Sequence, residues 1–229
     1  MASALELAET ALADIAGHGA GAWKQAVLAL EPMEPDAPAA AAVVAAYEAG
    51  RCPPWGAAAL LGAIGHADGY ATALAILRAA PGQLAESYAG PALVIMRGEA
   101  ALPDLEAVLE DDALPRRAHE GAAYGLAGIA DARAGELLVA AVDRERVRTS
   151  VAGSVACDRG VADHVLIGWL RGASPRRRNL AAWAVFHLAA KGRVSEALEQ
   201  AMRAALDGAP LPFTGAQREM LRDRLSPTN

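Results

Sequence analysis

A segment of about thirty residues recurs along the chain from Trp55 to Leu206, and each copy predicts two short helices around a tight joint. The stretches 61–77, 93–109, 126–142, 154–170 and 185–201 align without a gap and carry apolar residues at matching positions. One such unit is too small to bury its own apolar face, so neighbouring units must stack to form a core. The repeat therefore predicts an all-α chain of about five helical hairpins.

Composition agrees with helices that pack closely. Alanine makes up about a quarter of the 229 residues, whereas aromatic residues make up only 4%. Alanine has the highest helix propensity and little bulk, so it favours helices whose axes lie near one another. No apolar run is long enough to predict a membrane span, and residues 1–15 lack the features of a signal peptide. Cys52 and Cys157 lie far apart in the sequence, which favours reduced thiols and a cytoplasmic location.

The ends of the chain depart from the repeat and predict caps. We expect a single solenoid domain over 1–229, with an N-terminal helical cap at 1–52, repeats at 53–207 and a C-terminal cap at 208–229. Within the N-terminal cap, the sequence predicts helices at 4–15, 23–30 and 37–47. A break at 18–21 separates the first two, and Asp36 is predicted to cap the third. The predicted repeats begin at Pro53, Gln83, Pro115, Glu145 and Ser174. Pro91 lies inside a predicted helix, which it should kink or delay.

Charge is unevenly distributed along the chain. Residues 1–110 carry 13 acidic and 4 basic side chains, a balance of −9, whereas residues 111–229 carry 14 acidic and 17 basic, a balance of +3. This asymmetry predicts either a polarised molecule that offers its acidic half to a basic partner or simple drift on solvated surfaces. The overall charge of −6 argues against nucleic acid as the main ligand, because a duplex-binding surface needs a basic excess.

One stretch resembles a known repeat family. Residues 115–142 read PRRAHEGAAYGLAGIADARAGELLVAAV, and residues 175–205 are similar. Both resemble the HEAT-like repeats of phycobilisome-lyase-type proteins. The resemblance implies a right-handed α-α superhelix, a HEAT-like solenoid, with first helices on the convex side and second helices on the concave side. Members of this group bind proteins on the concave surface; some are chromophore lyases or their chaperones, some bind DNA, and one branch is a di-iron hydroxylase.

The His119-Glu120 pair is the one feature that suggests metal chemistry. The hydroxylase branch of the family holds two irons with His-Glu pairs on several repeats. Here the pair occurs once, and one dyad cannot fill two octahedral sites. The sequence therefore predicts a structural or surface role for His119, with no catalytic residue, metal ligand or cofactor. Cys157 lies in an apolar helix and is predicted to be a small, inert filler.

A set of arginines occupies the first turns of two predicted helices, where the helix dipole opposes positive charge. Two explanations remain open. The arginines can form an inter-repeat ladder with acids such as Asp111, Asp112 or Asp143, or they can form an edge that binds phosphate or a partner's carboxylates. The candidates for this anion-binding edge are Arg116, Arg117, Arg176, Arg177 and Arg178.

Polar positions on the second helices are the predicted partner-binding strip. Trp169 belongs to the same set, because exposed aromatic residues often contribute to binding, although a tryptophan at the end of a repeat helix is more often packed in the core. Trp55, Trp183 and Phe186 are predicted core residues. The full set of partner-binding candidates is Tyr70, Asp104, Arg133, Glu136, Asp163, His164, Trp169, Glu196 and Glu199.

These features together predict a non-catalytic scaffold or adaptor that binds another protein on a concave surface. A bacterial immunity or regulatory protein, in which an acidic chain blocks a basic partner, is one specific version of this hypothesis. The alternatives are an enzyme of the same repeat family, of lyase or metal-dependent hydroxylase type, and a nucleic-acid-binding protein like the HEAT-like DNA glycosylases. The sequence does not fix the oligomeric state.

Overall fold

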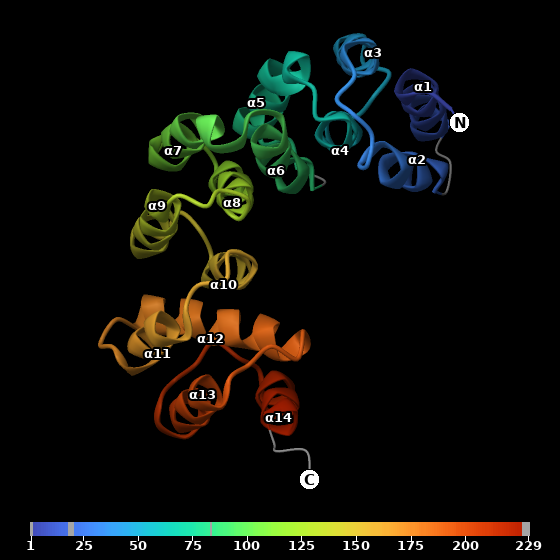
Figure 1. The fold of residues 1–229 in the computed structure, drawn as a ribbon. Helices are drawn as coiled ribbons and strands as arrows, with labels where there is room; N and C mark the ends of the chain where they lie inside the picture. Colours follow the sequence, from blue (N-terminus) through green and yellow to red (C-terminus); the bar gives the residue numbers. More distant parts are fainter. Residues whose placement is uncertain (1, 18–20, 83, 226–229) are drawn as a thin grey trace. The chain divides into compact units, whose positions relative to one another are not determined.

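The computed structural model describes residues 2–17, 21–82 and 84–225. These residues form helices, turns and loops and include no strand, which confirms the all-α prediction (Figure 1). The chain divides into two compact units, Met1–Asp131 and Ala132–Asn229. None of the helices within the described residues is both long and apolar enough to cross a membrane.

The first unit holds the cap and the first two and a half hairpins. Its elements are α1 (Ala4–Ala16), α2 (Ala22–Leu30), α3 (Ala37–Glu48), α4 (Pro54–Ile64), the 3-10 turn η1 (Ala67–Gly69), α5 (Tyr70–Ala79), α6 (Ala85–Arg97), the 3-10 turn η2 (Gly98–Ala101), α7 (Leu102–Glu110) and α8 (Arg116–Leu126). The second unit continues with α9 (Ala132–Asp143), α10 (Thr149–Asp158), α11 (Asp163–Arg171), α12 (Pro175–Ala190), α13 (Glu196–Gly208) and α14 (Gly215–Arg224).

The helix starts follow from capping residues that are visible in the sequence. The Asp36 carboxylate accepts a hydrogen bond from the Ala39 backbone N–H at 2.7 Å, as predicted for α3. Ser174 caps α12, and Pro175 occupies the first helical position, where its missing N–H costs nothing. Thr214 and Gln217 form a capping box at the start of α14. Residues 18–20 of the predicted break at 18–21, and the predicted repeat boundary at Gln83, lie outside the described residues.

Helix α6 runs through Pro91. It begins at Ala85, so the proline does not delay its start, contrary to one of the two predicted effects. The ring of Pro91 is half-buried and lies on the face that α6 turns toward α2 and α4, where it lines a groove instead of meeting a packed helix. A proline ring is easier to accommodate on such an open face.

Within the first unit, the first helices of successive hairpins pack against one another through glycine and alanine. A Cβ added to Gly90 on α6 would lie only 1.9 Å from the carbonyl oxygen of Gly121 on α8. A Cβ on Gly62 of α4 would lie 3.2 Å from the Cβ of Ala92 on α6. These small residues let the backbones of α4, α6 and α8 approach more closely than larger side chains would allow.

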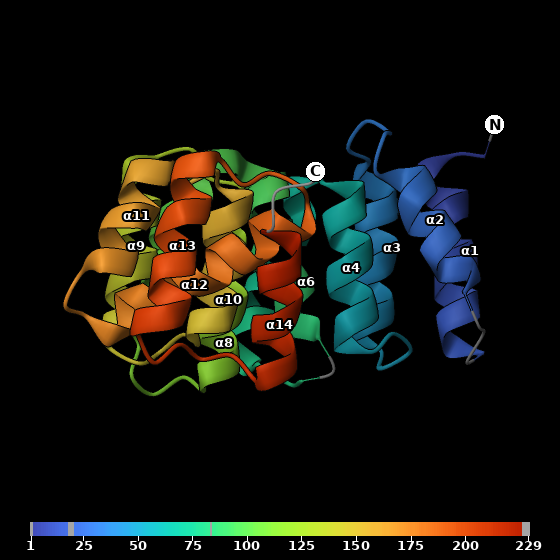
Figure 2. The same ribbon diagram turned by 90° about the horizontal axis from the view of Figure 1, so that it is seen from below.

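The close approach of the first helices sets how the first unit bends. In Figure 1, α2, α4, α6 and α8 form the inner row of this unit, and α1, α3, α5 and α7 form the outer row; Figure 2 shows α1 to α4 side by side. The expectation that first helices lie on the convex side is therefore wrong for the first unit. The physical reason is the glycine contact between neighbouring first helices, since a stack bends toward the row in which the helices lie closer.

The second unit repeats the small-residue contact and adds aromatic packing. A Cβ on Gly153 of α10 would lie 2.3 Å from the Cβ of Trp183 on α12. The rings of Trp183, Phe186 and Phe213 contact one another, with centroids 4.9 to 5.7 Å apart, and join α12 to the loop that precedes α14. Trp183 and Phe186, predicted as core residues, are half-buried in this cluster, and Trp55 in the first unit is half-buried as well.

We expect Gly90→Ala to lower the free energy of unfolding by about 2–4 kcal/mol, because the new methyl group would displace α8. Gly168→Ala on α11 is the matched control. Its added Cβ would meet nothing within 4 Å, so the higher helix propensity of alanine should stabilise the protein by up to about 1 kcal/mol. Urea denaturation followed by circular dichroism measures both changes. Equal stabilisation by the two substitutions would contradict the contact between α6 and α8.

Candidate binding groove

An open groove of about 730 Å³ crosses one face of the first unit. Helix α2 forms one wall, α6 forms the other, and α4 forms the floor. Small residues line the floor, namely Ala58, Ala59, Gly62 and Ala63. The walls carry the larger side chains, which are Trp23, Lys24, Val27, Leu28 and Glu31 on α2 and its end, and Ser87, Tyr88, Pro91, Ala92 and Ile95 on α6.

The spacing of these residues explains how three short helices make a groove. The wall positions on α2 and its end are 23, 24, 27, 28 and 31, which fall on one face of an α-helix. The wall positions on α6, from 87 to 95, follow the same period. Because Gly62 and Ala92 are both small, α4 and α6 lie close together, and the floor stays low between the side chains of the two walls. The groove thus forms because α4 carries small residues in the floor, and because the larger residues of α2 and α6 recur with the helical period and so line the two walls.

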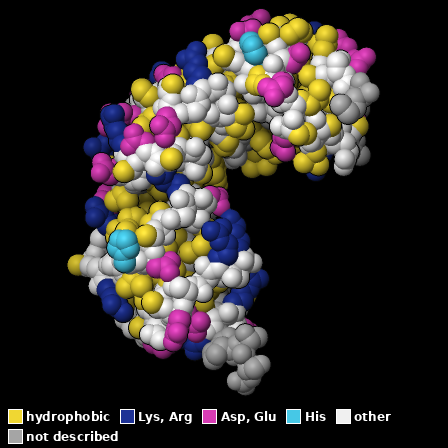
Figure 3. Space-filling view, viewed as in Figure 1, with side chains coloured by type: hydrophobic (Ala, Val, Ile, Leu, Met, Phe, Trp, Pro, Cys, Tyr) yellow, Lys and Arg dark blue, Asp and Glu magenta, His cyan; other side chains and the backbone are white. Residues whose placement is uncertain are grey.

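Large apolar side chains remain exposed along the groove. Leu28 is 59% exposed, Ile95 is 61% exposed and Tyr88 is 38% exposed. Hydrophobic side chains gather on the margin of the first unit where α4 and α6 lie (Figure 3). Single exposed apolar residues are ordinary, but several that line one hollow are typical of an interaction surface.

The two ends of the groove differ in charge. At one end, Trp23 and Trp55 stack edge to face with centroids 5.0 Å apart, and the Lys24 ammonium lies 5.6 Å from the Trp23 ring centroid. The backbone N–H of Trp23 donates to the Asp14 carboxylate at 2.9 Å, which anchors the start of α2. At the other end lie Glu31 and the carboxyl ends of α2, α4 and α6. Helix carboxyl ends carry partial negative charge, which adds to the charge of Glu31 at this end, whereas Lys24 lies at the other end.

Two of the predicted partner-binding residues contact each other inside the first unit. The Tyr70 hydroxyl donates to the Asp104 carboxylate at 2.7 Å, and the Arg97 guanidinium lies 3.9 Å from the centre of the Tyr70 ring. Burial and the neighbouring Asp104 carboxylate raise the pKa of Tyr70 above its ordinary value. Since Tyr70 is 4% exposed, its ring links two successive hairpins and presents little surface to a partner.

The remaining candidates of the predicted strip lie in the second unit. Arg133 and Glu136 are exposed on α9, and His164 is exposed on α11, where Asp163 and Trp169 are half-buried. On α13, the Glu199 carboxylate accepts from Arg203 Nη2 at 2.6 Å, and Glu196 accepts from Gln200 Nε2 at 3.2 Å. These residues sit on second helices as predicted. Their role in partner binding stays a prediction.

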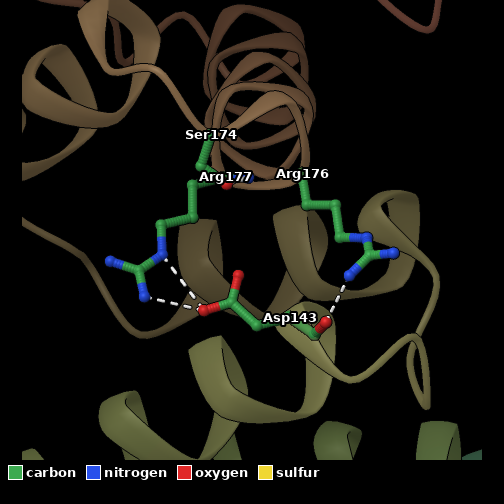
Figure 4. Close-up of polar contacts among 4 residues, drawn as sticks. All are labelled: Asp143, Ser174, Arg176 and Arg177. Atoms are coloured by element: carbon green, nitrogen blue, oxygen red, sulfur yellow. Dashed lines mark hydrogen bonds and ion pairs between the residues drawn. The ribbon is translucent and has the colours of Figure 1, made fainter.

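The arginines of the predicted anion-binding edge fall into two groups in the structure, one with intramolecular partners and one exposed on α8. Arg177 donates from Nε and Nη2 to the Asp143 carboxylate at 3.2 and 2.7 Å, and Arg176 donates to the Asp143 carbonyl (Figure 4). Arg176 also donates to the Glu145 carboxylate. Arg178 donates to the Gly172 carbonyl at 2.8 Å. These contacts match a ladder of ion pairs, with Asp143 as the acid for Arg177 and Glu145 as the acid for Arg176. Such exposed ion pairs contribute roughly 0.2–1 kcal/mol each.

The other two arginines of the edge, Arg116 and Arg117, are exposed in the first turn of α8. Arg117 lies beside the loop that follows α5, because a Cβ on Gly82 would be 3.1 Å from its Nη1. The carboxylate of Asp111, one of the acids proposed for the ladder, accepts instead from the backbone N–H of Ala113 at 3.0 Å. Anion binding at Arg116 and Arg117 stays a prediction.

The buried polar residues of the first unit have structural contacts. His119 is 5% exposed, and its Nε2 lies 3.0 Å from the Asp111 carbonyl oxygen, within hydrogen-bonding distance. Glu86, also buried, accepts from the Gly82 backbone N–H at 2.7 Å and so fixes the turn before α6. Within the described part of the chain, no three His, Cys, Asp or Glu side chains are placed to hold a metal ion. Burial against the Asp111 carbonyl supports a structural role for His119, which stays a prediction.

Both cysteines are buried and unpaired with each other. Burial raises the pKa of the Cys52 thiol to about 11, and it raises the pKa of Cys157 as well. A thiol is nucleophilic only as the thiolate, so these shifts keep both side chains unreactive near neutral pH. This agrees with the prediction that Cys157 is an inert filler.

Sequence reasoning missed the groove residues Leu28, Tyr88 and Ile95. The predicted strip consists of polar positions on second helices, whereas the groove presents apolar positions on α2 of the cap and on α6. In the sequence these residues look like ordinary core positions. The available signal was the row of small residues at 56–59 and 62–63, because a helix face without bulk leaves space beside larger neighbours.

Comparison of the chain with protein-family models gave no match, and comparison with curated proteins gave none. The resemblance to HEAT-like repeats therefore stays a prediction that rests on residues 115–142 and 175–205. Conclusions about function must rest on the geometry of the groove itself.

We expect Tyr70→Phe to destabilise the first unit by about 1–2 kcal/mol, because it removes a hydrogen bond to a carboxylate that is partly shielded from water. The ring and its contact with Arg97 are retained in this variant. Chemical denaturation measures the change. The double variant with Asp104→Ala is the control, since the loss from Tyr70→Phe should nearly disappear once the acceptor is absent. An unchanged loss in that background would contradict the link between Tyr70 and Asp104.

Proposed function

We propose that this chain is a non-catalytic protein-protein interaction module and that the groove between α2 and α6 is its binding surface. The observation that carries the proposal is the exposure of Leu28, Tyr88 and Ile95 around a floor of alanine and glycine. Ordinary folding pressure would bury these side chains. Their exposure in one hollow favours a surface that a partner covers.

Binding would follow from the shape of the groove. A partner's apolar side chains would fill the low floor, while Leu28 and Ile95 would pack on either side of them. Residues of this kind, at the centre of an interface, typically dominate the binding free energy. Trp23 and Tyr88 add rigid aromatic surface that loses little conformational entropy when a partner binds.

Finer aspects of the architecture and role belong to the same proposal. The recurring hairpins support a right-handed HEAT-like solenoid over the whole chain, acting as a cytoplasmic scaffold or adaptor. The first unit carries 17 acidic and 6 basic side chains, a balance of −11, and the second unit carries 10 acidic and 15 basic, a balance of +5. The acidic first unit suits the version of the hypothesis in which the chain regulates or inhibits a basic partner, as a bacterial immunity protein does.

Leu28→Glu and Ile95→Glu test the proposal, because each places a charge where apolar contact is expected. Affinity capture from extract of the source organism should lose the partner with both variants, since the loss of one central apolar contact weakens binding about thirtyfold, or 2 kcal/mol. Met220→Glu on α14 is the matched control. Met220 is 37% exposed but lies outside the groove, so this variant should retain the partner.

Circular dichroism and thermal melting should show that all three variants fold alike. Retention of the partner by both groove variants would overturn the proposal, and so would its loss from the Met220→Glu variant alone.

A further inference from the structure

The kind of partner follows from what the groove offers, and this inference rests on the proposed function. Both walls and the floor are α-helices, whose backbone N–H and C=O groups are bonded within each helix. An extended peptide would find no strand edge to pair with and would leave its own polar backbone groups unsatisfied. A partner helix satisfies its own backbone and needs only side-chain contacts.

The dimensions of the groove match a helix of about two to three turns. The lining positions on α2 and its end extend from Trp23 to Glu31, and those on α6 extend from Ser87 to Ile95. At a rise of 1.5 Å per residue these stretches are roughly 10–12 Å long. A partner helix would fill that length with apolar residues at positions i, i+3 or i+4, and i+7.

Helices α2, α4 and α6 run in the same direction beside the groove. Trp23 and Trp55, near the starts of α2 and α4, are in contact. At the opposite end, a Cβ added to Gly65 would lie 3.9 Å from Pro35 and 3.4 Å from Ile95. Gly65 follows α4, Ile95 lies in the last turn of α6, and Pro35 belongs to the loop between α2 and α3. Glu31, at the end of α2, lines the same groove as Ile95, so the carboxyl ends of the three helices lie at this end of the groove.

Charge at that end favours a positive group on the partner. Each helix carboxyl end carries a partial charge of about −0.5, and the exposed Glu31 adds a full negative charge to the groove wall. The whole unit has a balance of 17 acidic to 6 basic side chains, which attracts a basic molecule over a longer range. Lys24, the basic residue in the lining, lies at the other end of the groove.

We propose that the groove of the first unit binds a basic amphipathic α-helix of another protein. The apolar stripe of that helix packs against Leu28, Tyr88 and Ile95 and over the floor formed by α4. A lysine or arginine of the helix lies beside Glu31, near the carboxyl ends of α2, α4 and α6. The remaining basic residues of the helix face the acidic surface of the unit and raise the rate of association.

Three synthetic peptides of about 18 residues separate helix shape from charge. The first has a leucine stripe with helical period and lysines elsewhere, the second has the same stripe with glutamates, and the third has the composition of the first in scrambled order. Fluorescence anisotropy measures the binding of each labelled peptide to the full chain. We expect the basic stripe peptide to bind at least about ten times more tightly than either of the others.

Groove variants with neutral side chains show where the peptide binds. Leu28→Gln and Ile95→Gln should each weaken binding of the basic stripe peptide about tenfold or more, whereas Met220→Gln should leave it unchanged. Glu31→Gln should weaken it several-fold, and this difference should shrink as salt is added. Neutral replacements are used because a new carboxylate would itself attract the lysines.

Each other outcome overturns a defined part of the account. Equal binding of basic and acidic stripe peptides, both lost in Ile95→Gln, would leave the groove as a binding surface and reject the basic partner. If the scrambled peptide binds as tightly as the stripe peptide, and its binding is unchanged in Ile95→Gln, docking of a helix in the groove is rejected.

A dimer of the full chain, seen by sedimentation and abolished by Ile95→Gln, would show that a second copy occupies the groove. Failure of the proposed function would be recognised by a different result, because the Leu28→Glu and Ile95→Glu variants would then still capture the partner from the extract.

Discussion

The close contact between the first helices of successive hairpins is the constraint on which the first unit depends. Gly90 on α6 and Gly121 on α8 bring two backbones so near that neither position has room for a methyl group. Gly62 and Ala92 make a looser version of the same contact between α4 and α6. Because the helices of this row lie closer together than the second helices do, the unit bends toward this row. Side chains of neighbouring helices in the row therefore share one surface.

The groove is a direct consequence of that packing. Where α4 presents alanine and glycine between the larger residues of α2 and α6, the surface is hollow, and Leu28, Tyr88 and Ile95 stand exposed around it. The same residue types that allow helices to pack tightly inside the unit thus leave a gap at its surface. Parallel helices add a polarity to the gap, with Lys24 at one end and Glu31 beside three helix carboxyl ends at the other.

Local signals in the sequence predicted the helices well, because caps and periodicity act over a few residues. Asp36 and Ser174 mark helix starts as expected, and Asp143 pairs with Arg177 as the ladder hypothesis requires. The direction of bending and the location of the groove were not predicted. Both depend on contacts between residues about thirty positions apart, such as Gly90 with Gly121, which a single helical pattern does not reveal. The burial of Tyr70 was not predicted for the same reason. In the sequence it resembles an exposed polar position, and only the structure places the Asp104 carboxylate beside its hydroxyl.

Site-specific photo-crosslinking tests the central claim most directly. A benzophenone amino acid replaces Tyr88 in the groove in one variant and His164 on the second-helix strip in another, and both are irradiated in extract of the source organism. The account predicts that one partner protein becomes attached at position 88, and that position 164 does not capture it. Attachment of that partner at position 164, with none at position 88, would contradict the account and return the binding surface to the second helices.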